Sequence, residues 1–78
     1  MKDLLDRIET NPKIMLGKPV IKGTRITVEI ILKKLAQDIS VDEILRDYPG
    51  LTRDDIQAAL SYAATALSTE EILPLEAV

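Results

Sequence analysis

The sequence predicts a mainly α fold: one helix-turn-helix domain of three helices, preceded by a short β or irregular segment. Two observations carry this prediction. After residue 26, apolar residues recur in successive stretches at i, i+3, i+4 and i+7, which is the spacing of one helix face. Each stretch begins with a residue that favours a helix N-terminus, and a tight Pro49–Gly50 turn separates the last two stretches, as in helix-turn-helix domains.

The first 26 residues contain turns and short β-branched runs. The turn signals are Asn11–Pro12, Gly17–Lys18–Pro19 and Gly23–Thr24, and the β-branched runs are Val20–Ile21 and Ile26–Val28. Arg7–Glu9 can pair with Val20–Lys22 as a small hairpin. Leu4, Leu5 and Ile8 also suit one helical turn, so two alternatives remain for the N-terminal end.

Two helices are predicted next, over residues 27–37 and 41–48. Thr27 is placed as the N-cap of the first helix, and Asp38 can adopt the left-handed conformation that ends it. The second helix begins with a capping box, in which Ser40 and Glu43 satisfy each other's backbone N–H groups. Pro49–Gly50 ends it.

The third helix is predicted over residues 53–67, with Thr52 as its N-cap. We expect its buried stripe to consist of Ile56, Leu60, Ala63 and Leu67. The exposed positions are expected to be Arg53, Asp54, Asp55, Gln57, Ser61 and Thr65. Together these elements predict one domain over residues 1–68, with an extended, turn-rich segment over 1–26, and a tail over 69–78.

The composition argues against catalysis. The chain has no His and no Cys, which removes the imidazole base, the thiolate nucleophile and the usual zinc ligands. Adjacent acidic pairs lie at predicted helix starts, where carboxylates are electrostatically favoured. We therefore expect no enzyme, no catalytic or metal site and no cofactor. Four charges between Met1 and Ile8 argue against a signal peptide, and no apolar run suffices for a membrane span, so a cytoplasmic protein is expected.

Charge is divided unevenly along the chain. Residues 1–37 carry eight basic and four acidic side chains, whereas residues 38–78 carry two basic and nine acidic ones. Such asymmetry points to nucleic-acid contact or to two different binding surfaces. The candidate DNA contacts are Lys18, Lys22, Arg25 and Arg53, with Gln57 as the base reader. The alternative is a purely structural turn, in which Arg25 pairs with a carboxylate and Thr24 caps the turn.

Two further features indicate protein partners. The tail alternates acidic and apolar residues, and its candidate partner-binding residues are Ile72, Leu73, Leu75 and Val78. The third helix is rich in Ala and Ser, which lets another helix approach closely. That approach is either intrachain packing against the first helix or the interface of a homodimer, which would supplement the small core of a 78-residue chain.

A set of short motifs resembles a prokaryotic family known as domain of unknown function 433. The motifs are Arg7–Ile8, Asn11–Pro12, Gly17–Lys18–Pro19, Ile21, Gly23–Thr24–Arg25–Ile26, Tyr48–Pro49 and Asp54–Asp55–Ile56. The resemblance implies a homeodomain-like or winged-helix-like fold. It also implies a VapB-type antitoxin, whose partner would be a toxin resembling PIN-domain ribonucleases.

Two functions are therefore expected as alternatives. In the first, a non-enzymatic antitoxin-like protein of a prokaryotic toxin–antitoxin pair dimerises, binds operator DNA through its helical core and silences its toxin through its C-terminal residues. In the second, the same fold is a protein-interaction module that does not bind DNA. The basic loop and the resemblance favour the first function, and the acidic second half favours the second.

Overall fold

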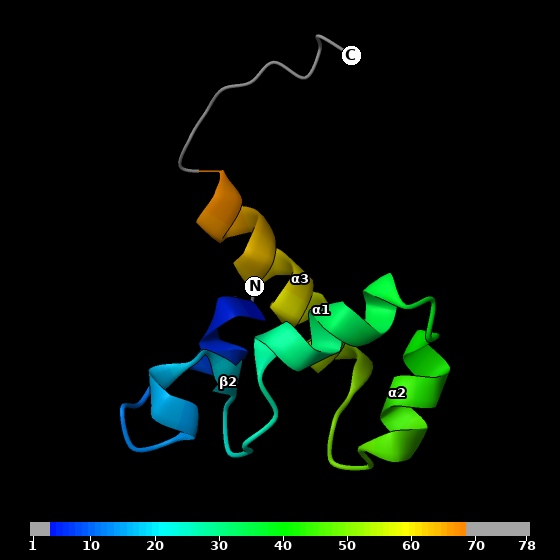
Figure 1. Cartoon of the computed structure of the whole chain (residues 1–78), viewed down its shortest axis with the longest axis horizontal. Coiled ribbons are helices and arrows are strands. Elements are labelled where there is room, and N and C mark those ends of the chain that lie inside the picture. Colours follow the sequence, from blue (N-terminus) through cyan, green and yellow to red (C-terminus); the bar gives the residue numbers. More distant parts are fainter. Residues whose placement is uncertain (1–3, 69–78) are drawn as a thin grey trace, which may run out of the picture.

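The computed structural model describes residues 4–68, which form three helices behind a short N-terminal strand pair. The elements in chain order are the 3-10 turn η1 (Leu4–Arg7), strand β1 (Ile8–Glu9), the 3-10 turn η2 (Met15–Gly17), strand β2 (Val20–Ile21) and helices α1 (Val28–Ala36), α2 (Val41–Asp47) and α3 (Arg53–Leu67). The predicted mainly α fold class is confirmed (Figure 1). Within residues 4–68, no helix is both long and apolar enough to cross a membrane.

Side-chain caps start all three helices, which explains why their predicted and observed bounds differ by at most one residue. The Thr27 hydroxyl accepts the Ile30 N–H at 3.0 Å at the start of α1. At α2, Ser40 and Glu43 form the expected reciprocal capping box. Asp38 has φ of 67°, the left-handed conformation expected just after α1. Local sequence therefore determines where each helix begins and ends.

The N-terminal segment contains both of the alternatives left open by its sequence. Residues Leu4–Arg7 form the turn η1, and β1 then pairs antiparallel with β2, with Ile8 opposite Ile21. The Lys22 N–H donates to the Arg7 carbonyl at 2.7 Å, which extends the pairing by one step. The helical turn and the hairpin follow one another, because Arg7 ends η1 and its carbonyl begins the strand pairing. Ile8, which suited the helical turn by sequence, lies in β1 instead.

The core collects one fully buried isoleucine from each helix. These are Ile31 of α1, Ile44 of α2 and Ile56 of α3, and Ile21 of β2 packs with them. Each of the three is the fourth residue of its helix, so the same spacing separates each N-cap from the core isoleucine that follows it. Burying an isoleucine side chain contributes about 1.5–3 kcal/mol.

The predicted buried face of α3 is wrong in two respects. Leu60 is 41% exposed and Leu67 is 77% exposed, whereas Asp55, expected on the surface, is only 6% exposed. The buried face is instead displaced toward Asp55, Ala58 and Ala59. Asp55 turns inward because its Oδ2 accepts the Thr52 N–H and its Oδ1 accepts from Arg7, the last residue of η1.

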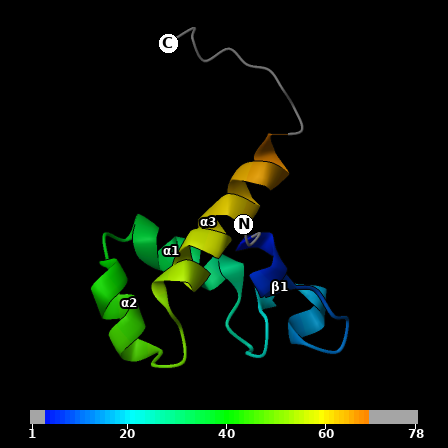
Figure 2. The same ribbon diagram turned by 180° about the vertical axis from the view of Figure 1, so that it is seen from behind.

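The far end of α3 extends beyond the rest of the folded body. Figure 1 and the reverse view in Figure 2 both show the last turns of α3 projecting past α1 and η1. The residues from Ala64 to Ser68 are all exposed. The first half of α3 is therefore a core element, whereas its second half is a surface element.

Candidate binding surface

A left-handed turn displays an apolar side chain beside the first helix. Three consecutive residues in η2 have positive φ: Met15 at 49°, Leu16 at 58° and Gly17 at 84°. This conformation costs roughly 1–2 kcal/mol for each residue that carries a Cβ atom. Leu16 is 93% exposed, so burial does not compensate for its strain in the free chain. Strained backbone and an exposed apolar side chain together make this turn a candidate binding surface.

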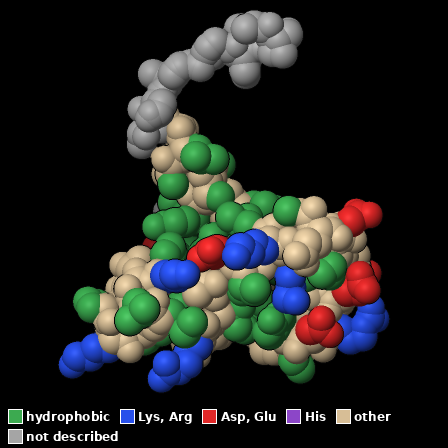
Figure 3. All heavy atoms as spheres, in the orientation of Figure 1, with side chains coloured by type: hydrophobic (Ala, Val, Ile, Leu, Met, Phe, Trp, Pro, Cys, Tyr) green, Lys and Arg blue, Asp and Glu red, His purple; other side chains and the backbone are tan. Residues whose placement is uncertain are grey.

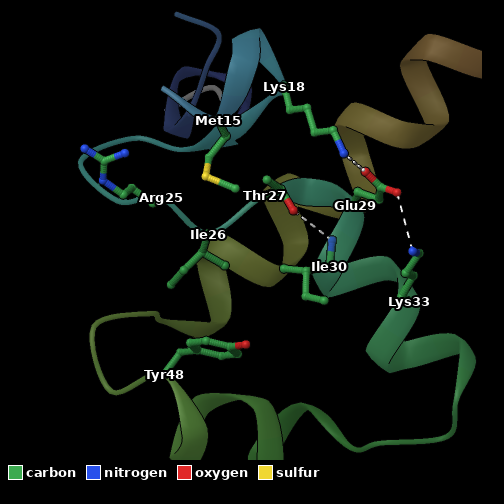
Figure 4. A pocket seen from close by; sticks show the side chains of 9 residues that line it. All are labelled: Met15, Lys18, Arg25, Ile26, Thr27, Glu29, Ile30, Lys33 and Tyr48. Atoms are coloured by element: carbon green, nitrogen blue, oxygen red, sulfur yellow. Dashed lines mark hydrogen bonds and ion pairs between the residues drawn. The ribbon is translucent and has the colours of Figure 1, made fainter. Parts of the chain in front are cut away.

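An open groove lies next to this turn. Its apolar lining consists of Met15, Ile26, Ile30 and Tyr48, and its volume is about 370 Å³. These side chains come from η2, the start of α1 and the end of α2, and Figure 4 shows how they surround the hollow. Three cations stand around the lining: Lys18, Arg25 and Lys33. We call this hollow, with its four apolar and three basic side chains, the basic-rimmed groove.

A carboxylate organises one side of the rim. The Lys18 ammonium donates to Glu29 Oε1 at 2.9 Å, and the Lys33 ammonium lies 3.6 Å from Glu29 Oε2. The hydrogen bond and charge of Lys18, together with the charge of Lys33, lower the pKa of Glu29 below its ordinary value of 4.5. Two cations thus share one anion, which leaves a net positive charge on this side of the groove (Figure 4).

Arg25 stands on the other side of the groove from Lys33 (Figure 4). Within residues 4–68 it has no carboxylate partner, which differs from the structural-turn alternative in which it pairs with one. Lys34 lies near the same region, with its ammonium 5.8 Å from the centre of the Tyr48 ring. The face seen in Figure 3 shows basic, acidic and apolar side chains intermixed.

The turn around Gly23 has a structural role. The Thr24 N–H donates to the Ile21 carbonyl at 2.9 Å, and Gly23 between them has φ of 84°, a conformation that favours glycine. The Thr24 hydroxyl donates to that same carbonyl and accepts the Ile26 N–H. Thr24 therefore caps the turn as the structural alternative expected, and the turn holds Arg25 outward.

The five predicted DNA contacts do not form one surface. Lys18 is paired with Glu29, and Arg53 is paired with Asp42 of α2. Lys18 and Arg25 border the same groove, but Lys22 lines a separate hollow with Asp6, Arg7 and Asp55. Gln57 is exposed on α3, a helix with no basic residue after Arg53.

Several residues of the groove were not identified from the sequence. The groove residues Met15, Ile30 and Lys33, and Leu16 beside the groove, belonged to no pattern that the sequence marked as functional, and Tyr48 was assigned to helix packing and to a family motif. The one available signal was Gly17, whose type is common at positive φ, but nothing marked Met15 and Leu16 as sharing its conformation. The predicted partner-binding residues Ile72, Leu73, Leu75 and Val78 lie outside the described residues. Among residues 4–68, no three acidic side chains gather into a metal-binding group.

Comparison with known proteins places the chain in a family. The family model described as protein of unknown function (DUF433) matches residues 8–63. The chain is 34% identical over 56 residues to the uncharacterized protein y4eO of Sinorhizobium fredii (strain NBRC 101917 / NGR234). That match covers 72% of this chain and 25% of y4eO, so the chain spans about a quarter of that relative's length.

A solved structure agrees with the family model. The crystal structure of a DUF433 member protein from Anabaena variabilis ATCC 29413, at 2.00 Å resolution, is similar with a TM-score of 0.73 and 34% sequence identity. The similarity covers 76% of this chain and 58% of the Anabaena chain. The expectation raised by the short motifs is confirmed: the chain belongs to the DUF433 family of proteins of unknown function.

Proposed function

We propose that the chain is a non-enzymatic, antitoxin-like protein of the cytoplasm that binds a toxin protein through the basic-rimmed groove and Leu16. The observation that carries this proposal is Leu16 itself, an almost fully exposed leucine held in a left-handed turn. Burying such a side chain in a complex contributes about 1.5–3 kcal/mol. A partner that covers Leu16 therefore offsets backbone strain that the free chain bears without compensation.

The groove also limits the chemistry of the partner. Its apolar lining accepts aliphatic or aromatic side chains, and its basic rim favours carboxylates beside them. The matching surface on a toxin, for which a PIN-like ribonuclease is the candidate, is an apolar side chain flanked by Asp or Glu. The tail residues Ile72, Leu73, Leu75 and Val78 are proposed as a second contact with the same toxin.

The test is binding of the full-length chain to the product of the adjacent gene, measured by titration calorimetry. Leu16→Glu is expected to weaken binding by about 30-fold or more, because it places a carboxylate where an apolar side chain is buried. Leu67→Glu makes the same substitution at a distant exposed leucine and is expected to leave binding unchanged. Wild-type affinity in Leu16→Glu, or no binding by the wild-type chain, would refute the proposal.

The contribution of the tail is tested separately. Deleting residues 69–78 is expected to weaken the complex while leaving the groove intact. An undiminished affinity would restrict the interface to the groove and Leu16.

Operator DNA is the second candidate ligand, because Lys22 and Arg25 are exposed and have no carboxylate partner within residues 4–68. The exposed carboxylates of Asp42 and Asp54 near the start of α3 oppose it, since they repel phosphates. If the groove binds protein and no DNA is bound, the chain is a protein-interaction module of the same fold.

DNA binding is tested by fluorescence anisotropy with a duplex from the chain's own promoter. Lys22→Ala and Arg25→Ala should each reduce the slope of log affinity against log salt by about 0.9. Undetectable binding at low salt, or an affinity that does not fall as salt rises, would exclude DNA as a ligand.

A further inference from the structure

The second half of α3 carries an apolar stripe that the folded chain leaves uncovered. Leu60, Ala63, Ala64 and Leu67 recur at i, i+3, i+4 and i+7, the spacing at which one helix packs against another. Leu60 and Leu67 are 41% and 77% exposed, and Ala64 is also exposed. This set, which we call the α3 stripe, coincides with most of the face that the sequence predicts as buried.

No charged residue lies near the stripe on its own helix. From Ile56 to Ser68 the sequence has neither an acidic nor a basic side chain. The projecting end of α3 accordingly shows only hydrophobic and uncharged side chains in Figure 3. Exposed helix faces in soluble proteins usually carry charge, so an uncharged and protruding helix end indicates an interface.

A hollow adjoins the stripe on the side of α1. It has a volume of about 430 Å³, and its apolar lining is formed by Pro19, Val28, Leu32, Ala36, Tyr62 and Ala63. Lys18, Glu29 and Lys33 also line it, and these are the same charged residues that stand on one side of the basic-rimmed groove. The molecule thus presents a protruding apolar helix end and an apolar hollow on adjoining parts of one surface. These two shapes can be complementary when two copies of the chain are related by a two-fold axis.

We propose that two copies of the chain associate through their α3 stripes, with the two helices antiparallel and crossing at Ala63 and Ala64. Leu60 and Leu67 are seven residues apart, which is about 10.5 Å along the helix. An antiparallel crossing midway between them places Leu60 of each copy against Leu67 of the other. The alanines at the crossing point allow the backbones to come close, and the projecting end of each helix then lies beside the hollow of the other copy.

The absence of charge selects a second copy as the occupant. A two-fold axis brings each residue near its own equivalent, so a charged stripe would place like charges together. The α3 stripe avoids this repulsion, because no charged residue lies between Ile56 and Ser68. Antiparallel helices also oppose their macrodipoles favourably. The stripe residues themselves lie outside the basic-rimmed groove, but the hollow beside the stripe shares Lys18, Glu29 and Lys33 with the groove. The dimer is therefore tested by substitutions in the stripe, which leave the groove lining unchanged.

Sedimentation equilibrium of the full-length chain tests the proposal. The wild-type protein is expected at 17.2 kDa, twice the mass of the 8.6-kDa chain. Leu67→Glu is expected to weaken the dimer by about 100-fold or more, since the substitution occurs twice in a two-fold interface. Its far-UV circular dichroism should stay that of the wild type, because Leu67 is mostly exposed in the single chain. Leu16→Glu, the matched control, should remain dimeric.

A monomeric wild-type chain, or a Leu67→Glu variant that remains dimeric, would overturn the proposal. The direction of the helices has its own test, since the native sequence has no cysteine. In a glutathione buffer, Leu60→Cys alone should form no disulfide dimer, whereas the double variant Leu60→Cys/Leu67→Cys should form one readily. A disulfide dimer from Leu60→Cys alone would contradict the antiparallel arrangement.

Discussion

The chain exposes two apolar surfaces that differ in almost every other respect. The basic-rimmed groove lies between η2, the start of α1 and the end of α2, and it is bordered by Lys18, Arg25 and Lys33. Two residues of η2, Met15 and Leu16, have strained backbone conformations. The α3 stripe lies on one regular helix, in the part from Ile56 to Ser68 that has no charged residue. Exposed apolar area alone therefore does not identify a partner. Surrounding charge distinguishes a surface suited to an acidic partner from one suited to a second copy.

The two surfaces also differ in how they are supported. Leu60 and Leu67 need only the continuation of α3, whereas Leu16 depends on a turn whose conformation is unfavourable for two of its three residues. The cost of this conformation is the reason why we propose a binding role for Leu16. The stripe, by comparison, is an unstrained helix face that stays exposed because α3 buries its Asp55, Ala58 and Ala59 face instead.

The largest expected effect on stability comes from removing the ion pair that joins the N-terminal segment to α3. The Arg7 guanidinium lies 3.1 Å from Asp55 Oδ1 and 3.4 Å from Asp54 Oδ2, and thereby ties the segment that leads to the groove onto the helix that carries the stripe. Arg7→Ala leaves the buried Asp55 carboxylate without its cation, and should lower the free energy of unfolding by about 1–3 kcal/mol.

Arg53→Ala is the matched control, because its ion pair with Asp42 is exposed. It should cost no more than about 1 kcal/mol. Urea denaturation of the two variants measures both values. Equal losses would mean that the Arg7–Asp55 contact does not join the two parts of the fold.

A smaller effect distinguishes the strained turn from the regular helix. Leu16→Gly removes left-handed strain but adds freedom to the unfolded chain, so stability should stay unchanged or rise by up to about 1 kcal/mol. Leu67→Gly should instead lower stability by up to about 1 kcal/mol, because glycine disfavours helix. Thermal unfolding compares the two variants directly. A clear loss of stability in Leu16→Gly would show that Leu16 supports the fold rather than binding.

The smallest effect concerns the rim of the groove. Lys18→Ala removes the main cause of the low pKa of Glu29, which should rise toward 4.5 in a carboxylate NMR titration. Since the folded-state pKa is depressed, the stabilisation is present above 4.5 and is lost as pH falls through the lower folded-state pKa. An unchanged Glu29 titration in Lys18→Ala would contradict the ion pairs assigned to the rim.

Most of the helical framework could be predicted because capping is local. Thr27, Ser40 and Thr52 act within three residues of themselves, and the three isoleucines that follow them are spaced to reach one core. The face of α3 could not be predicted in this way. Its orientation depends on the contact between Arg7 and Asp55, which lie 48 residues apart in the sequence.

The candidate site was less predictable than the fold. Positively charged residues were identified by type, but their ion pairs with Glu29 and Asp42 depend on tertiary structure. The left-handed conformations of Met15 and Leu16 have no local sequence signal, since neither residue type favours positive φ. The feature that makes this surface a candidate site, the positive φ of Met15 and Leu16, is therefore one that the local sequence does not favour.

The central claim is that the two apolar surfaces serve two different partners. Light scattering on full-length wild type, Leu16→Glu and Leu67→Glu, each mixed with the adjacent gene product, measures self-association and partner binding together. We predict that Leu16→Glu remains a 17.2-kDa dimer without the partner, and that Leu67→Glu binds the partner as a single 8.6-kDa chain. The prediction would be contradicted if either Leu16→Glu or Leu67→Glu lost both self-association and partner binding while remaining folded. It would also be contradicted if either substitution left both self-association and partner binding unchanged.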